Sequence, residues 1–253
     1  MSQLHTHTLY VHGHSPAHRL PSHVKVAALL VFLLGVVSTP REAFWAFGAH
    51  AAVLAVAART AQLTAPFMVR RMLVEVPFVL FAAFLPFLGP DPRVEVLGIS
   101  LSQEGLWGAW SILARATLGT GAAVLLAATT EVPDILTGLS RLKVPAVLVA
   151  IAGFMVRYLD VLADELGRMR TAAAVRGFRQ RGRGALRALA SVAGSLFIRA
   201  YERGERIHAA MVVRGYRGVM PQPFASPAVA ADWSRGLALP LVGVTVAVLA
   251  VLL

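Results

Sequence analysis

The chain has 253 residues, of which 57% are hydrophobic, and its mean hydropathy is +0.67. This exceeds the usual apolar share of soluble proteins, and several apolar stretches approach or exceed 18 residues, so an all-α integral membrane protein is predicted instead of a soluble domain. The formal net charge is +11, and the absence of cysteine excludes disulfides, thiolate metal ligands and a cysteine nucleophile.

Residues 1–23 form a polar N-terminal segment that holds six of the eight histidines. Imidazoles can bind nickel, cobalt or zinc, but these lack the fixed helical spacing of an ordered site and have no acid or cysteine among them. We interpret the segment as a loosely ordered polar tail, with metal handling as the alternative. No cleaved signal peptide is indicated. The six histidines are His5, His7, His12, His14, His18 and His23.

Residues 24–130 are expected to form a membrane domain of four spans, and residues 233–253 a C-terminal transmembrane helix. The amphipathic stretch 67–75 is expected to lie at the membrane interface before the third apolar run. The Gly89-Pro90-Asp91-Pro92 sequence breaks the helix after that run. The four apolar runs of the membrane domain are 24–37, 43–58, 76–88 and 106–130.

Charged loops predict how these spans are oriented. Lys and Arg near membrane ends are held on the cytoplasmic side, so the basic loop 59–71 is predicted inside and the acidic loop 91–104 outside. The apolar stretch 144–156 is about 13 residues long, below the roughly 17 that a crossing needs. The number of crossings is therefore predicted as five, with six as the alternative.

Arg115 lies inside the fourth predicted span. An unpaired charge at the centre of a membrane helix costs roughly 2.5–3.5 kcal/mol on insertion scales, so this side chain should face the bundle interior or a polar partner. A structural clamp and a role in transport are equally supported interpretations.

Residues 131–220 are predicted to form a cytoplasmic module. Apolar residues recur every three or four positions between 154 and 218, which predicts two long amphipathic helices that each end at a glycine. Between Arg157 and Arg217 the chain carries thirteen arginines against five acids, a net +8. Proline-containing helix starts are expected at 131–134 and at Pro145.

The two predicted helices end in the same phrase. Val175-Arg176-Gly177-Phe178 reappears 38 residues later as Val213-Arg214-Gly215-Tyr216. A guanidinium at a helix C-terminus is favoured by the dipole and can reach a partner's carboxylates or carbonyls, the glycine permits a left-handed turn, and the aromatic ring offers a buriable anchor. The simpler interpretation is two ordinary helix caps on a solvated basic face. The upstream repeat of Arg168 by Arg206 and of Ala172 by Ala210 favours a duplicated docking surface.

The sequence offers no catalytic or nucleotide-binding motif. There is no phosphate-binding loop of the Gly-x-x-x-x-Gly-Lys-Ser/Thr type, so any ATPase must be a separate subunit, and no cofactor is expected. No nucleophile–base set or paired intramembrane carboxylates are found, so the chain is predicted to be no enzyme. The Arg-Gly run 181–184 has no interleaved aromatic residues, which favours a turn over RNA binding.

The duplicated Arg-Gly ends resemble those of the transmembrane T component of energy-coupling factor transporters, the EcfT/CbiQ family, although valine replaces the family's alanine in both copies. The similarity covers nearly the whole chain and is nearest to the cobalt/nickel CbiQ branch. The other stretches that carry it are 15–20 with Val24-Lys25, 70–77, 129–134 and 157–170.

The resemblance implies a membrane scaffold that couples two cytoplasmic ABC-type ATPase subunits to a membrane-embedded substrate-binding subunit, in the plasma membrane of a prokaryote. Each Arg-Gly end would dock on one ATPase, and cobalt or nickel would be the cargo. The alternative is a stand-alone secondary transporter or channel whose basic helices bind membrane lipids. A membrane-anchored nucleic-acid binder has only charge in its favour, so no nucleic-acid partner is expected.

Overall fold

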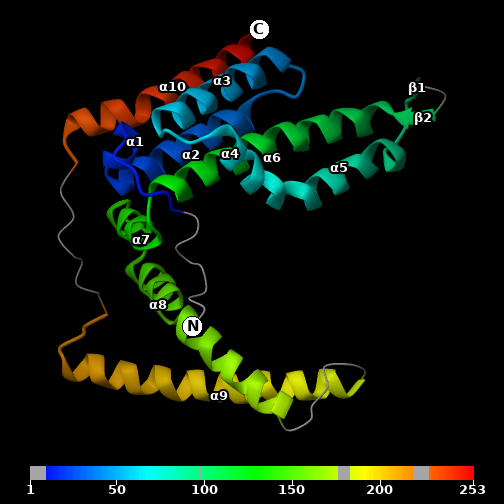
Figure 1. The fold of residues 1–253 in the computed structure, drawn as a ribbon. Helices are drawn as coiled ribbons and strands as arrows, with labels where there is room; N and C mark the ends of the chain where they lie inside the picture. The colour runs from blue at the N-terminus through cyan, green and yellow to red at the C-terminus, as the bar shows by residue number, and fades with distance from the viewer. Residues whose placement is uncertain (1–9, 97–98, 176–182, 219–227) are drawn as a thin grey trace. The chain divides into compact units, whose positions relative to one another are not determined.

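The computed structural model describes residues 10–96, 99–175, 183–218 and 228–253, and these fall into two compact units. The membrane unit consists of α1–α7, a β-hairpin and α10, and the second unit consists of α8 and α9 (Figure 1). The elements of the membrane unit are α1 (Pro16–Arg19), α2 (Ser22–Ser38), α3 (Phe44–Thr60), α4 (Ala65–Met72), the 3-10 turn η1 (Leu73–Glu75), α5 (Val76–Leu88), β1 (Arg93–Val96), β2 (Ile99–Ser102), α6 (Gln103–Thr129), α7 (Val132–Arg141) and α10 (Ala230–Leu252). The second unit holds α8 (Ala146–Val175) and α9 (Arg183–Val213).

The helices confirm an all-α membrane protein. Four segments are long and apolar enough to cross a membrane, namely Ala65–Leu88, Gln103–Thr129, Ala146–Val175 and Ala230–Leu252. The apolar helices α2 and α3 have 17 residues each, at the lower end of the range that spans a bilayer. The apolar stretch 144–156 does not stand alone, because it opens the 30-residue helix α8. The length of this stretch therefore does not exclude a crossing by α8. The described residues hold helices for either five or six crossings.

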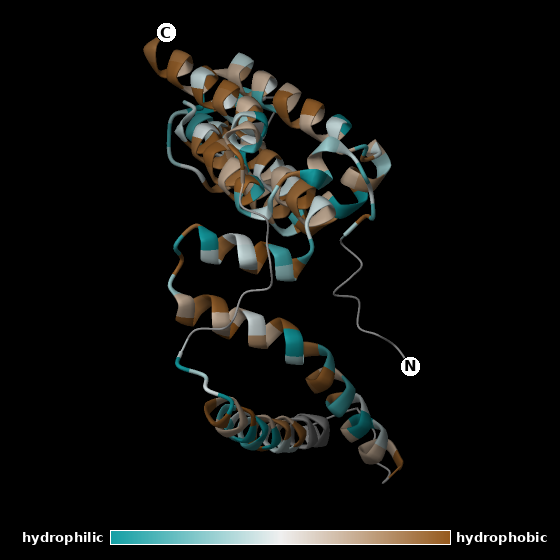
Figure 2. Cartoon of the chain, turned by 90° about the vertical axis from the view of Figure 1, so that its left-hand side faces the viewer, coloured by the Kyte–Doolittle hydropathy of each residue, from teal (hydrophilic) through white to brown (hydrophobic). Residues whose placement is uncertain are grey.

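The membrane unit buries a small core and exposes large apolar side chains outward. Phe32, Val36, Phe47, Leu118 and Ala122 form a core cluster between α2, α3 and α6. Large hydrophobic side chains of α5 and α10 are exposed, and Figure 2 shows hydrophobic residues along most of α10 up to the C-terminus. Lipid tails cover such a surface as well as protein does, so these exposed faces are those expected of a membrane protein.

Helix α10 lies directly beside α2, although the two are far apart in the chain (Figure 1). A Cβ atom added to Gly35 of α2 would lie 3.3 Å from the carbonyl carbon of Gly243 and from the backbone nitrogen of Val244. The face of α10 that is buried here consists of Pro240, Gly243 and Ala247. Small residues let two membrane helices approach closely and gain van der Waals contact.

The segments on either side of α5 hold features that the sequence analysis did not identify. The predicted amphipathic stretch 67–75 covers the last part of α4 and η1, which lead into α5, and its place at the membrane interface stays a prediction. Glu75 at its end is 5% exposed and accepts a hydrogen bond from Thr117 Oγ1 at 2.7 Å. The loop after α5 contains a two-stranded antiparallel hairpin, β1–β2, that sequence reasoning missed. Its strands alternate polar and apolar residues over only four positions, which is too short a pattern to be distinctive.

The described part of the N-terminal segment is folded, not a loosely ordered tail. The backbone N–H of Val11 donates to Ala128 O at 2.9 Å, at the end of α6. The His18 ring lies between Ser15 Oγ (2.7 Å from Nδ1) and Val11 O (2.9 Å from Nε2). Both ring nitrogens of His18 are thus occupied, and the described residues contain no group of three His, Cys, Asp or Glu that could hold a metal. His5 and His7 lie outside the described residues.

Candidate functional site

The C-terminus of α9 ends in a closed, glycine-dependent turn. Gly215 has φ +86°, the left-handed conformation that L-residues adopt only with strain. The N–H of Tyr216 donates to Met211 O at 2.9 Å, and the N–H of Gly215 donates to Val212 O at 2.9 Å. This pair of bonds is a Schellman motif, which satisfies helix-end carbonyls and fixes the direction in which the chain leaves.

Arg214 stands at this helix end with its side chain exposed. Its backbone N–H donates within the last turn, to Ala210 O and Met211 O, whereas the guanidinium makes no ion pair with a described carboxylate. Val213 beside it is 88% exposed. A planar cation at the negative end of a helix, next to an exposed apolar side chain, is suited to a partner that offers acceptor groups.

Tyr216 is half-buried and lies against its own unit. The sequence analysis instead predicts its ring as an anchor for a partner. It lines a groove of about 360 Å³ between α8 and α9, with Phe154 and Tyr158 from α8 and Ile207 and Met211 from α9. The rings of Phe154 and Tyr158 are stacked, with centroids 6.3 Å apart. The tyrosine therefore connects the Arg-Gly end to the contact between the two helices.

An ion-pair bridge joins α8 to α9. Glu165 accepts hydrogen bonds at 2.6 Å from Arg168 on its own helix and at 2.6 Å from Arg199 on α9, and its side chain is only 13% exposed. The i,i+3 pair is readable from the sequence, but the partner on α9 is 34 residues away and no local pattern identifies it.

The first copy of the repeated phrase is described only at its first residue. Val175 is the last described residue of α8, and it is 84% exposed. Arg176, Gly177 and Phe178 lie outside the described residues.

Arg115 belongs to a buried polar cluster of the membrane unit that sequence reasoning did not assemble. Its Nη2 donates to Thr39 O at 2.9 Å, at the end of α2. Thr39 Oγ1 donates to Gly35 O at 2.9 Å and lies 3.0 Å from Nε2 of His50, and both Thr39 and His50 are fully buried. Because the threonine proton is used by Gly35, His50 Nε2–H is the donor in this contact. The cluster ties α6 to α2 and α3.

The chain resembles known proteins over most of its length. A family model described as "CbiQ: Cobalt transport protein" matches residues 13–223. The chain is 35% identical over 152 residues to the cobalt transport protein CbiQ of Rhodobacter capsulatus, a match that covers 58% of this chain and 60% of that protein. It is 27% identical to an uncharacterized protein of Methanocaldococcus jannaschii, over 79% of this chain and 70% of that protein. A putative fused cobalt transport protein CbiMQ of Methanocorpusculum labreanum is 26% identical over 52% of this chain and 22% of its own length.

Proposed function

The chain belongs to the CbiQ family of cobalt transport proteins, and from this premise we propose that it is the coupling subunit of an ATP-driven importer of cobalt, or of the chemically similar nickel. It is a multi-pass protein of the prokaryotic plasma membrane. In the proposal it hydrolyses no ATP itself. It transmits the movement of two cytoplasmic ATPase subunits, bound at the Arg176-Gly177 and Arg214-Gly215 ends, to a membrane-embedded substrate-binding subunit.

The observation that carries the proposal is the exposed guanidinium of Arg214 on a closed helix end. The Schellman turn satisfies carbonyls of the last turn and points the chain away, so the end of α9 is a firm surface instead of a frayed one. Arginine recognises carboxylates and carbonyl groups through a planar set of donors. The sequence repeats the same phrase directly after the described part of α8, which in the proposal gives one Arg-Gly motif for each of two like partners.

The contact between α8 and α9 supports a mechanical role. Helix α9 has 31 residues, which at about 1.5 Å per residue gives a rod of about 45 Å. The Glu165 bridge and the Tyr216 groove tie this rod to α8 within one compact unit. A displacement at either Arg-Gly end would move the helix pair as a body, as in rigid-body switching.

The membrane partner is the second part of the proposal. The relative in Methanocorpusculum labreanum is described as a fused cobalt transport protein, CbiMQ. This description supports a second membrane component that works beside the chain. In the proposal the cargo is bound by that second component and need not touch the chain.

Charge reversal at both ends tests the proposal. We expect Arg176→Glu with Arg214→Glu to abolish co-purification of the ATPase subunits while the protein still inserts into the membrane. The matched control is Arg59→Glu with Arg70→Glu, which changes the charge equally at exposed positions of the membrane unit and should leave the complex whole. If the double variant at the helix ends purified with its ATPases in full yield, the proposal would be wrong.

The buried Arg115–Thr39–His50 cluster is the one observation that favours the stand-alone transporter, because such a protein needs polar groups inside the membrane. Its position at the end of α2, where Thr39 is the C-cap, favours a structural clamp instead. Cobalt uptake into liposomes by the isolated chain, without ATP or other subunits, would support the transporter.

A further inference from the structure

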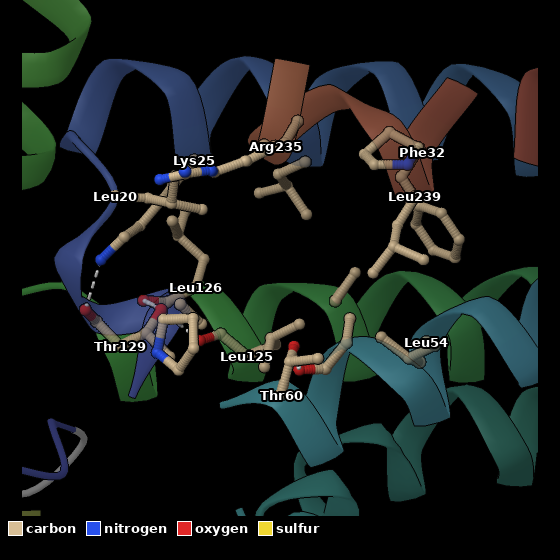
Figure 3. Close-up of a pocket in the computed structure, with 18 of the residues that line it drawn as sticks. Leu20, Lys25, Phe32, Leu54, Thr60, Leu125, Leu126, Thr129, Arg235 and Leu239 are labelled. Atoms are coloured by element: carbon tan, nitrogen blue, oxygen red, sulfur yellow. Dashed lines mark hydrogen bonds between the residues drawn. The ribbon is translucent and has the colours of Figure 1, made fainter. Parts of the chain in front are cut away.

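The membrane unit contains a cavity that the proposed coupling function does not use. It measures about 450 Å³ and lies among α1, α2, α3, α6 and α10. Figure 3 shows Leu20, Lys25 and Arg235 at one end and Phe32, Leu54 and Leu239 at the other. A volume of this size is typical of a site for a small ligand, and an apolar wall with a few polar groups at one end suits an amphiphile.

The polar end of the cavity is cationic. Arg19, Lys25 and Arg235 line it together with one acid, Asp232, which gives a net charge of +2. Asp232 Oδ2 already accepts a hydrogen bond from the backbone N–H of Val229, at 3.0 Å, as a helix cap. Arg19 and Arg235 are exposed and form no ion pair with a carboxylate of the described chain. Two guanidinium groups are therefore available to an anion from outside.

Lys25 has a different role at the same end. Its ammonium donates to His18 O at 3.1 Å and to Thr129 O at 2.8 Å, which leaves one of its three protons. The bond to Thr129 covers the carbonyl end of α6, whose dipole would otherwise repel an anion. Helices α2 and α10 begin at this end, so their positive N-termini add to the favourable field.

From the apolar depth and the cationic rim we infer that the cavity binds one acyl chain of an anionic phospholipid, whose phosphate is held by Arg19 and Arg235. The distance along α2 from Lys25 to Phe32 is about 10 Å at 1.5 Å per residue. A cavity of this depth is filled by part of an acyl chain and not by a lipid headgroup. The basic loop 59–71 places the cationic end of the cavity on the cytoplasmic side in the predicted topology. On that side anionic lipids attract Lys and Arg. The bound lipid joins α10 to α3 and α6.

The test uses the full chain in detergent and does not depend on any ATPase, so it stands apart from the coupling proposal. Binding of fluorescent phosphatidylglycerol is titrated on the unaltered protein and on Arg19→Gln with Arg235→Gln. At about 1 kcal/mol for each basic residue near an anionic lipid, we expect binding to weaken about 30-fold. Arg59→Gln with Arg70→Gln removes two exposed basic residues elsewhere on the predicted cytoplasmic side and should change binding less than twofold.

Further arms separate the sources of the anion. Phosphatidylcholine and glycerol phosphate should compete at least tenfold more weakly than unlabelled phosphatidylglycerol, because the first lacks net charge and the second lacks the acyl chain. Equal competition by either one, or unchanged binding in Arg19→Gln with Arg235→Gln, would overturn the inference. Because the chain has no cysteine, the substitution Leu125→Cys allows a thiol-reactive cross-linker to be attached at the cavity wall alone. A cross-link from this position to a helix of another membrane subunit in the assembled transporter would show a protein occupant and also overturn it.

Discussion

Replacing Gly215 with alanine tests the turn that holds the Arg-Gly end of α9. At φ +86° an alanine is strained by about 1–2 kcal/mol, and the lower entropy of the unfolded chain offsets about 0.4–1 kcal/mol of this. The net effect is a loss of about 1 kcal/mol. Nothing lies within 4 Å of a Cβ atom added at this position, so the loss would be conformational and not a steric clash.

Gly194→Ala is the matched control, because Gly194 lies in the interior of the same helix and also has open space around its Cβ position. There alanine should stabilise the helix by about 0.8–1 kcal/mol through its higher propensity. The same substitution inside α9 and in the turn that follows it should therefore differ in its effect on stability by about 2 kcal/mol and in sign. Gly215→Asn should recover most of the loss, because asparagine tolerates the left-handed conformation.

Hydrogen exchange and ATPase binding are the two measurements. The amide of Tyr216, bonded to Met211 O, should exchange about fivefold faster in Gly215→Ala, and the affinity for the ATPase subunit should fall by about the same factor if docking needs the closed turn. Equal exchange in Gly215→Ala and in the unaltered protein would refute the role of the turn. Faster exchange with unchanged ATPase affinity would refute its role in docking.

Three further substitutions test contacts within each unit. Gly35→Val should lower the free energy of unfolding by about 1–3 kcal/mol, because its methyl groups meet the backbone of α10, whereas Gly48→Val has open space and should cost less; denaturation in mixed detergent compares them. Thr39→Val leaves the Nε2–H of a buried histidine without a partner and should cost about 1–2 kcal/mol in the same assay, with little loss from Thr245→Val on an exposed face. Glu165→Gln should loosen α8 from α9, measured as a wider distance distribution between spin labels.

Local patterns predicted the helices of the second unit well. The three-to-four-residue apolar period and the glycine stop gave α9, which ends at Val213, and the left-handed turn at Gly215. Pro133 and Pro145 marked the starts of α7 and α8. Each of these features depends on residues within a few positions of one another, and such information is present in a single sequence.

Features that depend on distant contacts were not predictable in the same way. The Val11 bond to Ala128 and the Lys25 bond to Thr129 join the N-terminal segment and the start of α2 to the end of α6, more than a hundred residues away. From its sequence, a polar and histidine-rich stretch is predicted to be loosely ordered, because no local pattern shows where its backbone N–H and C=O groups find hydrogen-bond partners. The contacts likewise group α7 with the membrane helices and not with α8, whereas composition placed the boundary at residue 131. The location of the coupling residues stays a prediction.

The pairing of α2 with α10 has a consequence for how the protein is made. Roughly 190 residues separate the end of α2 at Ser38 from the start of α10 at Ala230. At about 5–20 residues per second, a ribosome needs about 10–40 s to reach the second helix after finishing the first. During that interval the face of α2 at Gly35 lacks its neighbour α10, and the cavity lacks the wall that α10 provides. The membrane insertion machinery or a lipid must occupy that place until α10 arrives, so the newly made chain depends on its surroundings until α10 has been synthesised.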